Sequence, residues 1–264
     1  MLSLNLEVIS KLPREKTHPT PLLFVHGAWH GAWCWENFLP YFAEHGYEAH
    51  ALSLRGHGNS EGRDGIRWYS IHEYVADVEQ VVRKMSAHPA LIGHSMGGYI
   101  VQKYLESHTH PAGVLLASMP TSGIFGMLLR MLKRHPASTL KTLLLMNPWH
   151  IVSTAALAKD YFFSDGFPND KFLEYYRHIQ AESVRMAVET TFFVFPRPKR
   201  IKTPLLVLGA ANDRVFSVSE EQKTARAYKT QAILYPDMAH NMMLERDWRA
   251  VADKILNWLS LHRI

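Results

Sequence analysis

The sequence predicts an α/β protein with a mostly parallel central sheet, flanking helices and an inserted helical segment. Three observations support this fold class. Short apolar runs of strand length alternate with stretches of helical periodicity, as in parallel sheets. Several of these runs end in Gly, His, Ser or Asp residues, at the edge where parallel sheets place their sites. Between residues 121 and 202, helical periodicity continues but no further strand of the sheet is evident.

The predicted strands are short runs bounded by turn residues. The first alternates polar and apolar residues, which indicates an edge strand, whereas most later runs are apolar throughout. Residues 11–20, which include Pro13 and Pro19, are expected to form an exposed connection. The expected strands cover residues 3–10, 21–25, 47–54, 89–93, 112–117, 205–209 and 232–235.

The predicted helices beside the sheet carry apolar residues three and four positions apart. In the helix expected at 71–85, the acids Glu73, Asp77 and Glu79 are expected on the solvated face or as local caps. A polar helix at 217–228 begins at Ser217 or Ser219, with acids in its first turn. The other helices are expected at 33–45 and 99–106 and at the C-terminus, where Trp248, Val251, Ile255, Trp258 and Leu259 share one face.

Residues 121–202 are too long for an ordinary connection of an α/β unit, which is a few residues plus one helix. We therefore expect a core of residues 1–120 and 203–264 with a helical cap at 121–202. Most of the Met, Leu and Phe residues of the cap are expected in its own small core, and the rest toward a substrate. Its helices are expected at 124–132, 140–146, 155–163, 171–180 and 182–195, with prolines ending the last one.

Ser95 is the candidate nucleophile, because it stands at the centre of Gly-His-Ser-Met-Gly at residues 93–97. A Gly-x-Ser-x-Gly turn between a strand and a helix strains the serine backbone and presents the hydroxyl to a cleft. The runs at 89–93 and 99–106 supply that strand and helix, which favours this interpretation over an ordinary Gly/Ser-rich loop.

A serine hydroxyl needs a histidine base and an acid that orients the histidine. Asp213 follows the expected strand 205–209, and His240 lies in the loop after the last expected strand. The strand at 112–117 ends without a carboxylate, which leaves Asp213 as the natural acid. We therefore predict a triad of Ser95, His240 and Asp213.

Two residues compete for these roles. His57 is an alternative base, although it precedes the nucleophile in the chain. Asp237 is an alternative acid, three residues before His240 and in the same loop. The order serine, acid, histidine, each after its own strand, favours Asp213 and His240.

Two upstream motifs complete a pattern. His-Gly-Ala-Trp at 26–29 follows one expected strand, and Arg-Gly-His-Gly at 55–58 follows the next. Together with Gly-His-Ser-Met-Gly-Gly at 93–98, a late Asp and a later His, these motifs resemble the α/β-hydrolase superfamily, in particular lipase- and esterase-like serine hydrolases with a helical cap. The resemblance covers residues 20–120 and 200–262, and the middle of the chain only loosely.

The resemblance implies an oxyanion hole made of the N–H groups of Ala28 and Met96, the residues after His-Gly and after the nucleophile. It also implies a two-stranded hairpin near the N-terminus. Only residues 1–20 precede the His-Gly strand, so one strand of that hairpin is expected to be missing or short.

These features predict a serine hydrolase that cleaves carboxylic esters through an acyl-enzyme, with an apolar small-to-medium acyl group and no cofactor. Hydrolysis of carbon–carbon, thioester or amide bonds, peroxyacid formation and cyanohydrin lysis remain alternatives, because fold and triad do not separate them. Dehalogenases and epoxide hydrolases of the superfamily need an aspartate where Ser95 stands. A non-catalytic ligand receptor is the remaining alternative, although a receptor has no need of the complete set of parts.

The composition limits which partners and which cellular compartment we expect for the protein. The chain has 264 residues and a net charge of +5, with scattered cations that do not suggest nucleic-acid binding. Cys34 is the only cysteine, so no intrachain disulfide forms and a reducing, cytoplasmic compartment is expected. No His-x-x-x-His pair lies on a clear helix beside a Glu, no apolar run is long enough to span a membrane, and the N-terminus does not resemble a signal peptide. The sequence leaves the oligomeric state open.

The first helix of the expected cap combines large apolar residues with Arg130, Lys133 and Arg134 near its end. Such a helix could cover the active-site cleft as a lid or lie on an anionic lipid surface. The lid is the favoured interpretation, because the helix dipole alone explains cations near a helix C-terminus.

Overall fold

The computed structural model describes residues 4–264 and contains a seven-stranded sheet in the order β1-β3-β2-β4-β5-β6-β7. β1 is antiparallel to β3, and every other neighbouring pair is parallel, which confirms the predicted fold class. The strands are β1 (Val8–Lys11), β2 (Leu22–Val25), β3 (Ala49–Leu52), β4 (Ala90–His94), β5 (Gly113–Leu116), β6 (Leu205–Ala210) and β7 (Ala232–Tyr235).

The first strand is shorter than its sequence predicts. Of the expected strand at 3–10, residue 3 lies outside the described part, residues 4–7 are not in a strand, and β1 begins at Val8. The preceding residues bind the loop after β3: Ser53 N–H donates to the Glu7 carbonyl at 2.9 Å, Asn5 N–H donates to Glu61 Oε2, and Ser53 Oγ donates to Glu7 Oε2 at 2.6 Å. One strand therefore precedes β2 among the described residues, which agrees with a reduced hairpin.

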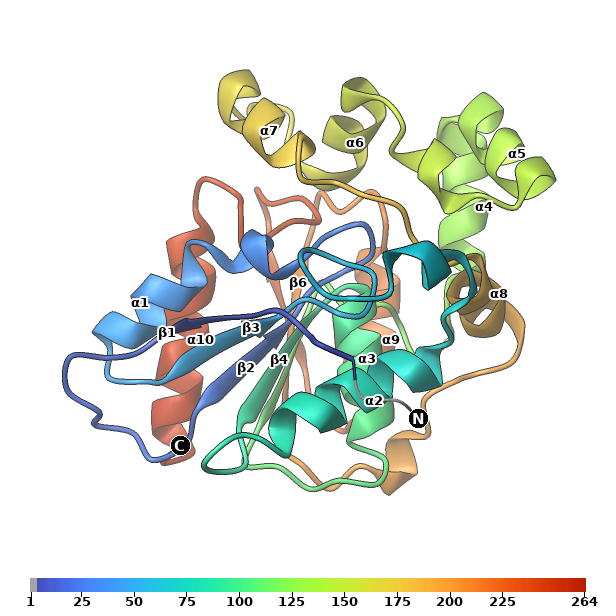
Figure 1. Ribbon diagram of the computed structural model, residues 1–264. Helices are drawn as coiled ribbons and strands as arrows, with labels where there is room; N and C mark the ends of the chain where they lie inside the picture. The colour runs from blue at the N-terminus through green and yellow to red at the C-terminus, as the bar shows by residue number, and fades with distance from the viewer. Residues whose placement is uncertain (1–3) are drawn as a thin grey trace.

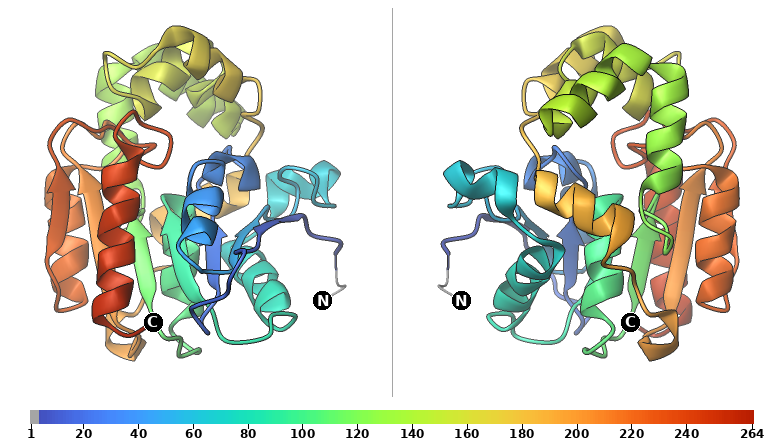
Figure 2. Two further views of the ribbon diagram at one scale, coloured as in Figure 1. Left: turned by 90° about the vertical axis from the view of Figure 1, so that its left-hand side faces the viewer. Right: turned by 90° about the vertical axis from the view of Figure 1, so that its right-hand side faces the viewer.

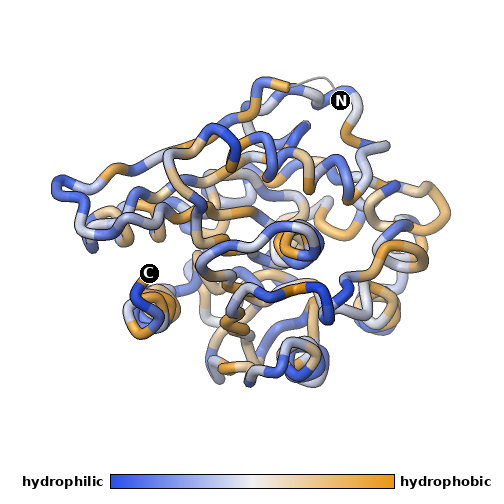
Figure 3. The backbone as a smooth tube through the Cα atoms, turned by 90° about the horizontal axis from the view of Figure 1, so that it is seen from below, coloured by the Kyte–Doolittle hydropathy of each residue, from blue (hydrophilic) through white to orange (hydrophobic). Residues whose placement is uncertain are grey.

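Helices cover both faces of the sheet (Figures 1 and 2). Seen nearly end-on in Figure 3, the C-terminal helix turns hydrophobic residues toward the middle of the molecule, in keeping with its buried Val251, Ile255 and Leu259. One face carries α1 (Phe38–Glu44) and α10 (Trp248–Leu261), and the other carries α2 (Ile71–Val82), α3 (Met96–Tyr104) and α9 (Val218–Ala227).

The helix expected at 33–45 is divided into a 3-10 turn, Ala32–Trp35, and α1. Pro40 explains the division, since proline has no N–H to donate and is tolerated in the first turn of a helix but not in its interior. α1 begins at Phe38, which places Pro40 in that first turn.

Asp77 departs from its expected solvated position. It lies on the buried side of α2 and is fully buried, because Arg55 from the loop after β3 pairs with it through Nη2 and Oδ1 at 2.7 Å. Glu73 does act as a cap, in a capping box with Ser70. Helical spacing alone could not reveal the partner of Asp77.

Between β5 and β6 the chain forms helices that lie beyond the carboxyl ends of the strands, except that the last one descends beside α2 (Figures 1 and 2). No strand interrupts residues 121–202, and the helix expected at 182–195 begins later, at Val184, with Ser183 as its cap. The division into a core and a cap stays a prediction. The helices are α4 (Phe125–Arg134), α5 (Pro136–Leu145), α6 (Ala155–Phe162), α7 (Asn169–Tyr176) and α8 (Val184–Phe192).

Three further 3-10 turns, Arg63–Trp68, Pro148–Ile151 and Pro198–Arg200, lie in the connections. In residues 4–264, no helix is long and apolar enough to cross a membrane.

Candidate active site

Ser95 stands between the end of β4 and the start of α3, with backbone angles φ 52° and ψ −119°. Side chains rarely adopt this left-handed region, so the surrounding turn must hold the residue there. Gly97 allows the turn to close, because a Cβ at that position would lie 2.2 Å from the carbonyl oxygen of Val25. The sequence-predicted elbow is therefore present, and the serine is almost completely buried.

His240 and Asp213 are joined at the same edge of the sheet. The imidazole Nδ1 of His240 lies 2.8 Å from Asp213 Oδ2, and both side chains are buried. Asp213 Oδ1 accepts the N–H groups of Val215 and Phe216 at 2.6 and 3.0 Å, which fixes the carboxylate. Because a carboxylate only accepts, Nδ1 carries a proton, so in the neutral ring Nε2 is the nitrogen with the free lone pair.

The ring of His240 is held between two phenylalanines. Phe216 and Phe162 lie 5.5 and 5.9 Å from it between ring centroids. Phe216 also lines the cavity that Ser95 lines. In the described chain, Ser95 and His240 do not hydrogen-bond to each other, and such bonds often tighten only when substrate binds.

The N–H groups of Ala28 and Met96 have no hydrogen-bond acceptor within residues 4–264. Met96 is the first residue of α3, where the helix leaves its N–H groups unpaired and favours negative charge. Both residues line the same cavity as Ser95. The two positions implied by the motifs therefore offer free donors beside the candidate nucleophile.

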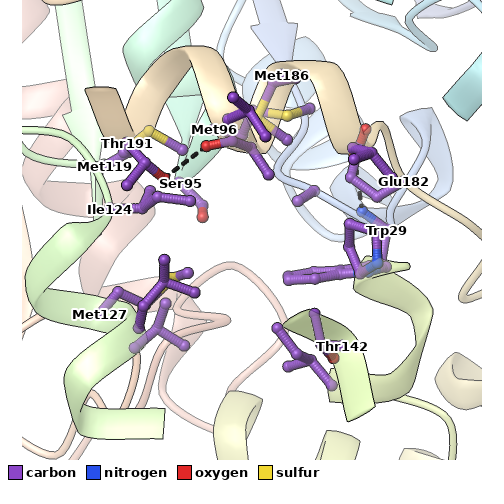
Figure 4. Close-up of a pocket in the computed structure, with 18 of the residues that line it drawn as sticks. Trp29, Ser95, Met96, Met119, Ile124, Met127, Thr142, Glu182, Met186 and Thr191 are labelled. Carbon is purple, nitrogen blue, oxygen red and sulfur yellow. Dashed lines mark hydrogen bonds between the residues drawn. The ribbon is translucent and has the colours of Figure 1, made fainter. Parts of the chain in front are cut away.

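The cavity has a volume of about 250 Å³ and apolar walls (Figure 4). Ser95 lies at its floor on the core, while α4 and α8 contribute residues such as Met127 and Met186 to its walls. The helical segment thus supplies most of the surface that a substrate would meet.

The two competing candidates lie elsewhere. Asp237 is exposed, in the loop after β7, and the His240 ring is bound to Asp213 instead. His57 is fully buried, and its Nε2 lies 3.1 Å from Glu182 Oε2. Neither residue lines the cavity of Ser95, which is also true of His240 and Asp213, so the hydrogen bond between His240 and Asp213 is what distinguishes the two pairs.

Glu182 is a site residue that sequence reasoning missed. It is buried, it lines the cavity, and it is the one carboxylate among the described residues that do so. Burial alone would raise the pKa of Glu182, but the proximity of His57 and the hydrogen bonds to its carboxylate outweigh burial and lower the pKa. In the sequence it looks like an ordinary acid at the start of a helix, so no local signal distinguishes it.

No group of three or more His, Cys, Asp or Glu residues is arranged to hold a metal ion in the described chain. The expectation that the protein needs no metal or cofactor stays a prediction.

Comparison with known proteins agrees with the fold. The family model described as "Hydrolase_4: Serine aminopeptidase, S33" matches residues 18–247. Fold, family and structural neighbours together define an α/β hydrolase of the esterase- and lipase-like kind. Within that class, the chain belongs to the serine aminopeptidase S33 family.

Individual relatives differ in how much of their length is matched. A monoacylglycerol lipase of Mycolicibacterium smegmatis is 23% identical over 253 residues, which cover 91% of this chain and 88% of the lipase. A non-heme chloroperoxidase of Burkholderia pyrrocinia is 34% identical over 107 residues, 38% of this chain and 37% of the chloroperoxidase. A protein of Arabidopsis thaliana described as a chloroplastic methylesterase is 33% identical, and the match spans only 27% of its length.

Solved structures share the fold at low identity. An esterase from Exiguobacterium antarcticum superposes with a TM-score of 0.72 and 15% identity, covering 97% of this chain and 96% of the esterase. An enol-lactonase from Burkholderia xenovorans gives a TM-score of 0.74 at 13% identity, covering 97% of both chains.

Proposed function

We propose that the protein is a serine hydrolase that cleaves carboxylic esters with an apolar acyl chain. One observation carries the proposal: Ser95, held at a strained turn, opens into the same apolar cavity as two N–H groups that have no acceptor. The pairing of His240 with Asp213 supports it, because it holds the proton of the neutral imidazole on Nδ1 and places the lone pair on Nε2.

In this mechanism, Ser95 Oγ attacks the ester carbonyl carbon while His240 Nε2 takes the hydroxyl proton. The N–H groups of Ala28 and Met96 stabilise the negative charge that develops on the carbonyl oxygen. His240 then gives the proton to the leaving alcohol, and the acyl group remains on Ser95. Water attacks this acyl-enzyme with His240 as base, which releases the acid and restores the serine.

A peptide bond with a free N-terminus is the second candidate substrate, because the matching family model is described as a serine aminopeptidase. Such a substrate brings an ammonium group that needs a carboxylate. Glu182 is the one acid that lines the cavity in residues 4–264, and its oxygens already accept four hydrogen bonds. A carboxylate has about four acceptor positions, so Glu182 has none left for an ammonium group, which favours a neutral ester.

The outer surface of the helical segment supports contact with an anionic lipid surface. Leu144 is 82% exposed and Phe193 is 73% exposed, and both flank residues that line the cavity. Lys133 on α4 and Lys141 on α5 are also exposed, and no Asp or Glu occurs from residue 121 to residue 159. We propose that this face meets anionic lipid while the inner residues of α4 cover the cleft.

The proposal is tested with p-nitrophenyl esters from acetate to palmitate and with a fluorophosphonate probe. Wild type should hydrolyse at least one ester and become labelled at Ser95. Ser95→Ala should lose both properties while its melting transition stays unchanged, because the turn accepts a smaller side chain. Substantial hydrolysis by a folded Ser95→Ala would rule out the mechanism, and a panel of thioesters, amides and peroxide-dependent reactions would then identify the chemistry.

A further inference from the structure

The peptide group between Ala28 and Trp29 is hydrogen-bonded at both ends. Its carbonyl oxygen lies 2.7 Å from His30 Nδ1, and its N–H donates to Glu182 Oε2 at 3.2 Å. Burial lowers the pKa of His30 to about 4, so the ring is neutral at neutral pH and donates through Nδ1. The adjoining N–H, that of Ala28, is the proposed oxyanion donor, and its direction depends on how this peptide is held.

The backbone of Trp29 does not hold that orientation by itself. Trp29 has a φ of 64°, in the left-handed region that side chains other than glycine rarely adopt. Such a conformation persists only where surrounding contacts determine it. The contacts of the Trp29 N–H and carbonyl are therefore the ones that shape the loop.

Glu182 supplies the first of these contacts from outside the core. Besides the Trp29 N–H, its carboxylate faces His57 Nε2 at 3.1 Å, the Tyr74 hydroxyl at 2.9 Å and the Ser183 N–H at 2.6 Å. The other nitrogen of His57 lies 3.0 Å from the carbonyl oxygen of Arg55, so both sides of the ring are held. Three neighbours besides Trp29 thus fix the carboxylate.

Gln180 supplies the second contact. Its N–H donates to the Trp29 carbonyl at 3.0 Å, and its side-chain amide binds the Gly58 N–H and the Gly56 carbonyl at 2.9 and 2.8 Å. Residues 180–182, here called the clasp, lie on the segment that returns from α7 to α8 (Figure 1). Figure 4 shows Glu182 directly against Trp29 on the wall of the cavity.

We propose that Glu182 is a positioning residue that orients the Ala28 N–H toward the developing oxyanion. It acts through the Ala28–Trp29 peptide, and it makes the oxyanion site depend on docking of the clasp onto the core. This inference rests on the proposed serine-hydrolase function. A group that acts in this way should affect transition-state stabilisation more than substrate binding.

The test compares Glu182→Gln, which keeps the shape but removes the charge, with Glu174→Gln as the matched control. Glu174 is 61% exposed on α7 and pairs only with Lys171. Glu182→Gln should lower kcat about 100-fold, the effect of losing one oxyanion donor, with KM changed less than about threefold. A boronic acid, which forms a tetrahedral adduct on the serine, should lose affinity in proportion to kcat. Glu174→Gln should match wild type in each measurement.

Two further measurements keep the test decisive. Amide hydrogen exchange should be faster in the peptide covering residues 26–33 of Glu182→Gln than in wild type, because a neutral amide holds the Trp29 N–H more weakly than a carboxylate does. If Glu182→Gln does not fold, Glu182→Asp is measured in its place. This variant keeps the charge, but its side chain is shorter by one methylene, so its carboxylate lies farther from the Trp29 N–H and kcat should fall at least tenfold.

The outcomes are distinct. A wild type without Ser95-dependent labelling or turnover would overturn the proposed function and this inference with it. If wild type is active, an unchanged kcat in Glu182→Gln overturns the inference alone, whether or not the melting temperature falls. A raised KM at constant kcat would show that Glu182 binds substrate and would also overturn the positioning role.

Discussion

The imidazole of His94, the residue immediately before Ser95, lies with Nε2 3.0 Å from the main-chain carbonyl oxygen of His240. A carbonyl only accepts, so Nε2 carries the proton of the neutral ring, and burial lowers the pKa of His94 well below its usual value. The strand that carries the candidate nucleophile thus also holds the loop of its candidate base.

We expect His94→Ala to lower kcat by about 10- to 100-fold, because a shift of about 1 Å in a catalytic group can cost about that much. KM should change little. Stopped-flow ester hydrolysis and fluorophosphonate labelling measure the effect, and circular dichroism checks the fold. Labelling of a folded His94→Ala at the wild-type rate would show that the carbonyl contact does not position His240.

The acid assignment predicts a difference between two aspartates. Asp213→Asn should lower kcat about 10³-fold or more, because the amide can no longer hold the imidazole in the required tautomer. Asp237→Asn should stay close to wild type, since Asp237 is exposed away from the cavity. Steady-state kinetics on one ester compares them, and a reversed order of effects would make Asp237 the acid.

The cavity predicts a preference for medium acyl chains over acetate. Each buried methylene contributes about 0.8 kcal/mol, so two of them raise kcat/KM by about tenfold where the pocket holds them. The series from acetate to palmitate measures this preference. An optimum at acetate with a decline at butyrate would contradict an apolar acyl site.

If the outer side of the helical segment meets lipid and its inner side borders the cavity, substitutions should affect lipid binding and catalysis separately. Leu144 is exposed on α5, whereas Leu128 on α4 lines the cavity. Leu144→Asp should abolish co-sedimentation with phosphatidylglycerol vesicles and leave hydrolysis of a soluble short-chain ester unchanged. Leu128→Asp should raise KM for that same ester. If wild type does not sediment at low salt, the lipid proposal is wrong and only the lid role of α4 remains.

The buried carboxyl of Glu221 should make the stability of the protein depend on pH. It is buried on α9, and neither carboxylate oxygen has a hydrogen-bond partner in the described chain. Burial, then the charges of Asp213 and Glu220, raise its pKa well above the usual value. Because the pKa is higher in the folded state, the protonated carboxyl stabilises the fold. This stabilisation is complete below the unfolded-state pKa of about 4.3 and is lost as the pH rises through the folded-state pKa.

The free energy of unfolding of wild type should therefore fall from pH 5 to pH 8, and in Glu221→Met this decrease should be smaller. Urea unfolding at both pH values gives the free energies of unfolding, and the advantage of the variant should be larger at pH 8. Parallel pH profiles for wild type and Glu221→Met would show that this carboxyl does not titrate over that range.

The sequence predicted the sheet and the main candidates because their signals are local. A strand, a glycine-flanked turn and a helix around Ser95 are visible within a few residues, and Asp213 and His240 follow recognisable strands. Asp77 and Glu182 were missed for the opposite reason. Each is a buried acid whose partners lie far away in the chain, at Arg55 for Asp77 and at Trp29 and His57 for Glu182, and helical periodicity carries no information about such pairs.

The helical segment leaves the sheet after β5 and returns to β6, its direct neighbour, with Leu116 opposite Leu208. In terms of evolution and engineering, the segment joins the carboxyl end of β5 to the amino end of the neighbouring parallel strand, so a foreign segment that makes the same crossover can be exchanged there without changing the order of the strands. Such an exchange must preserve one set of contacts, because residues 180–182 hydrogen-bond to two loops of the core. A chimaera that carries the helical segment of another hydrolase should therefore keep Gln180 and Glu182, or the imported segment should contain residues that make the same contacts with the core.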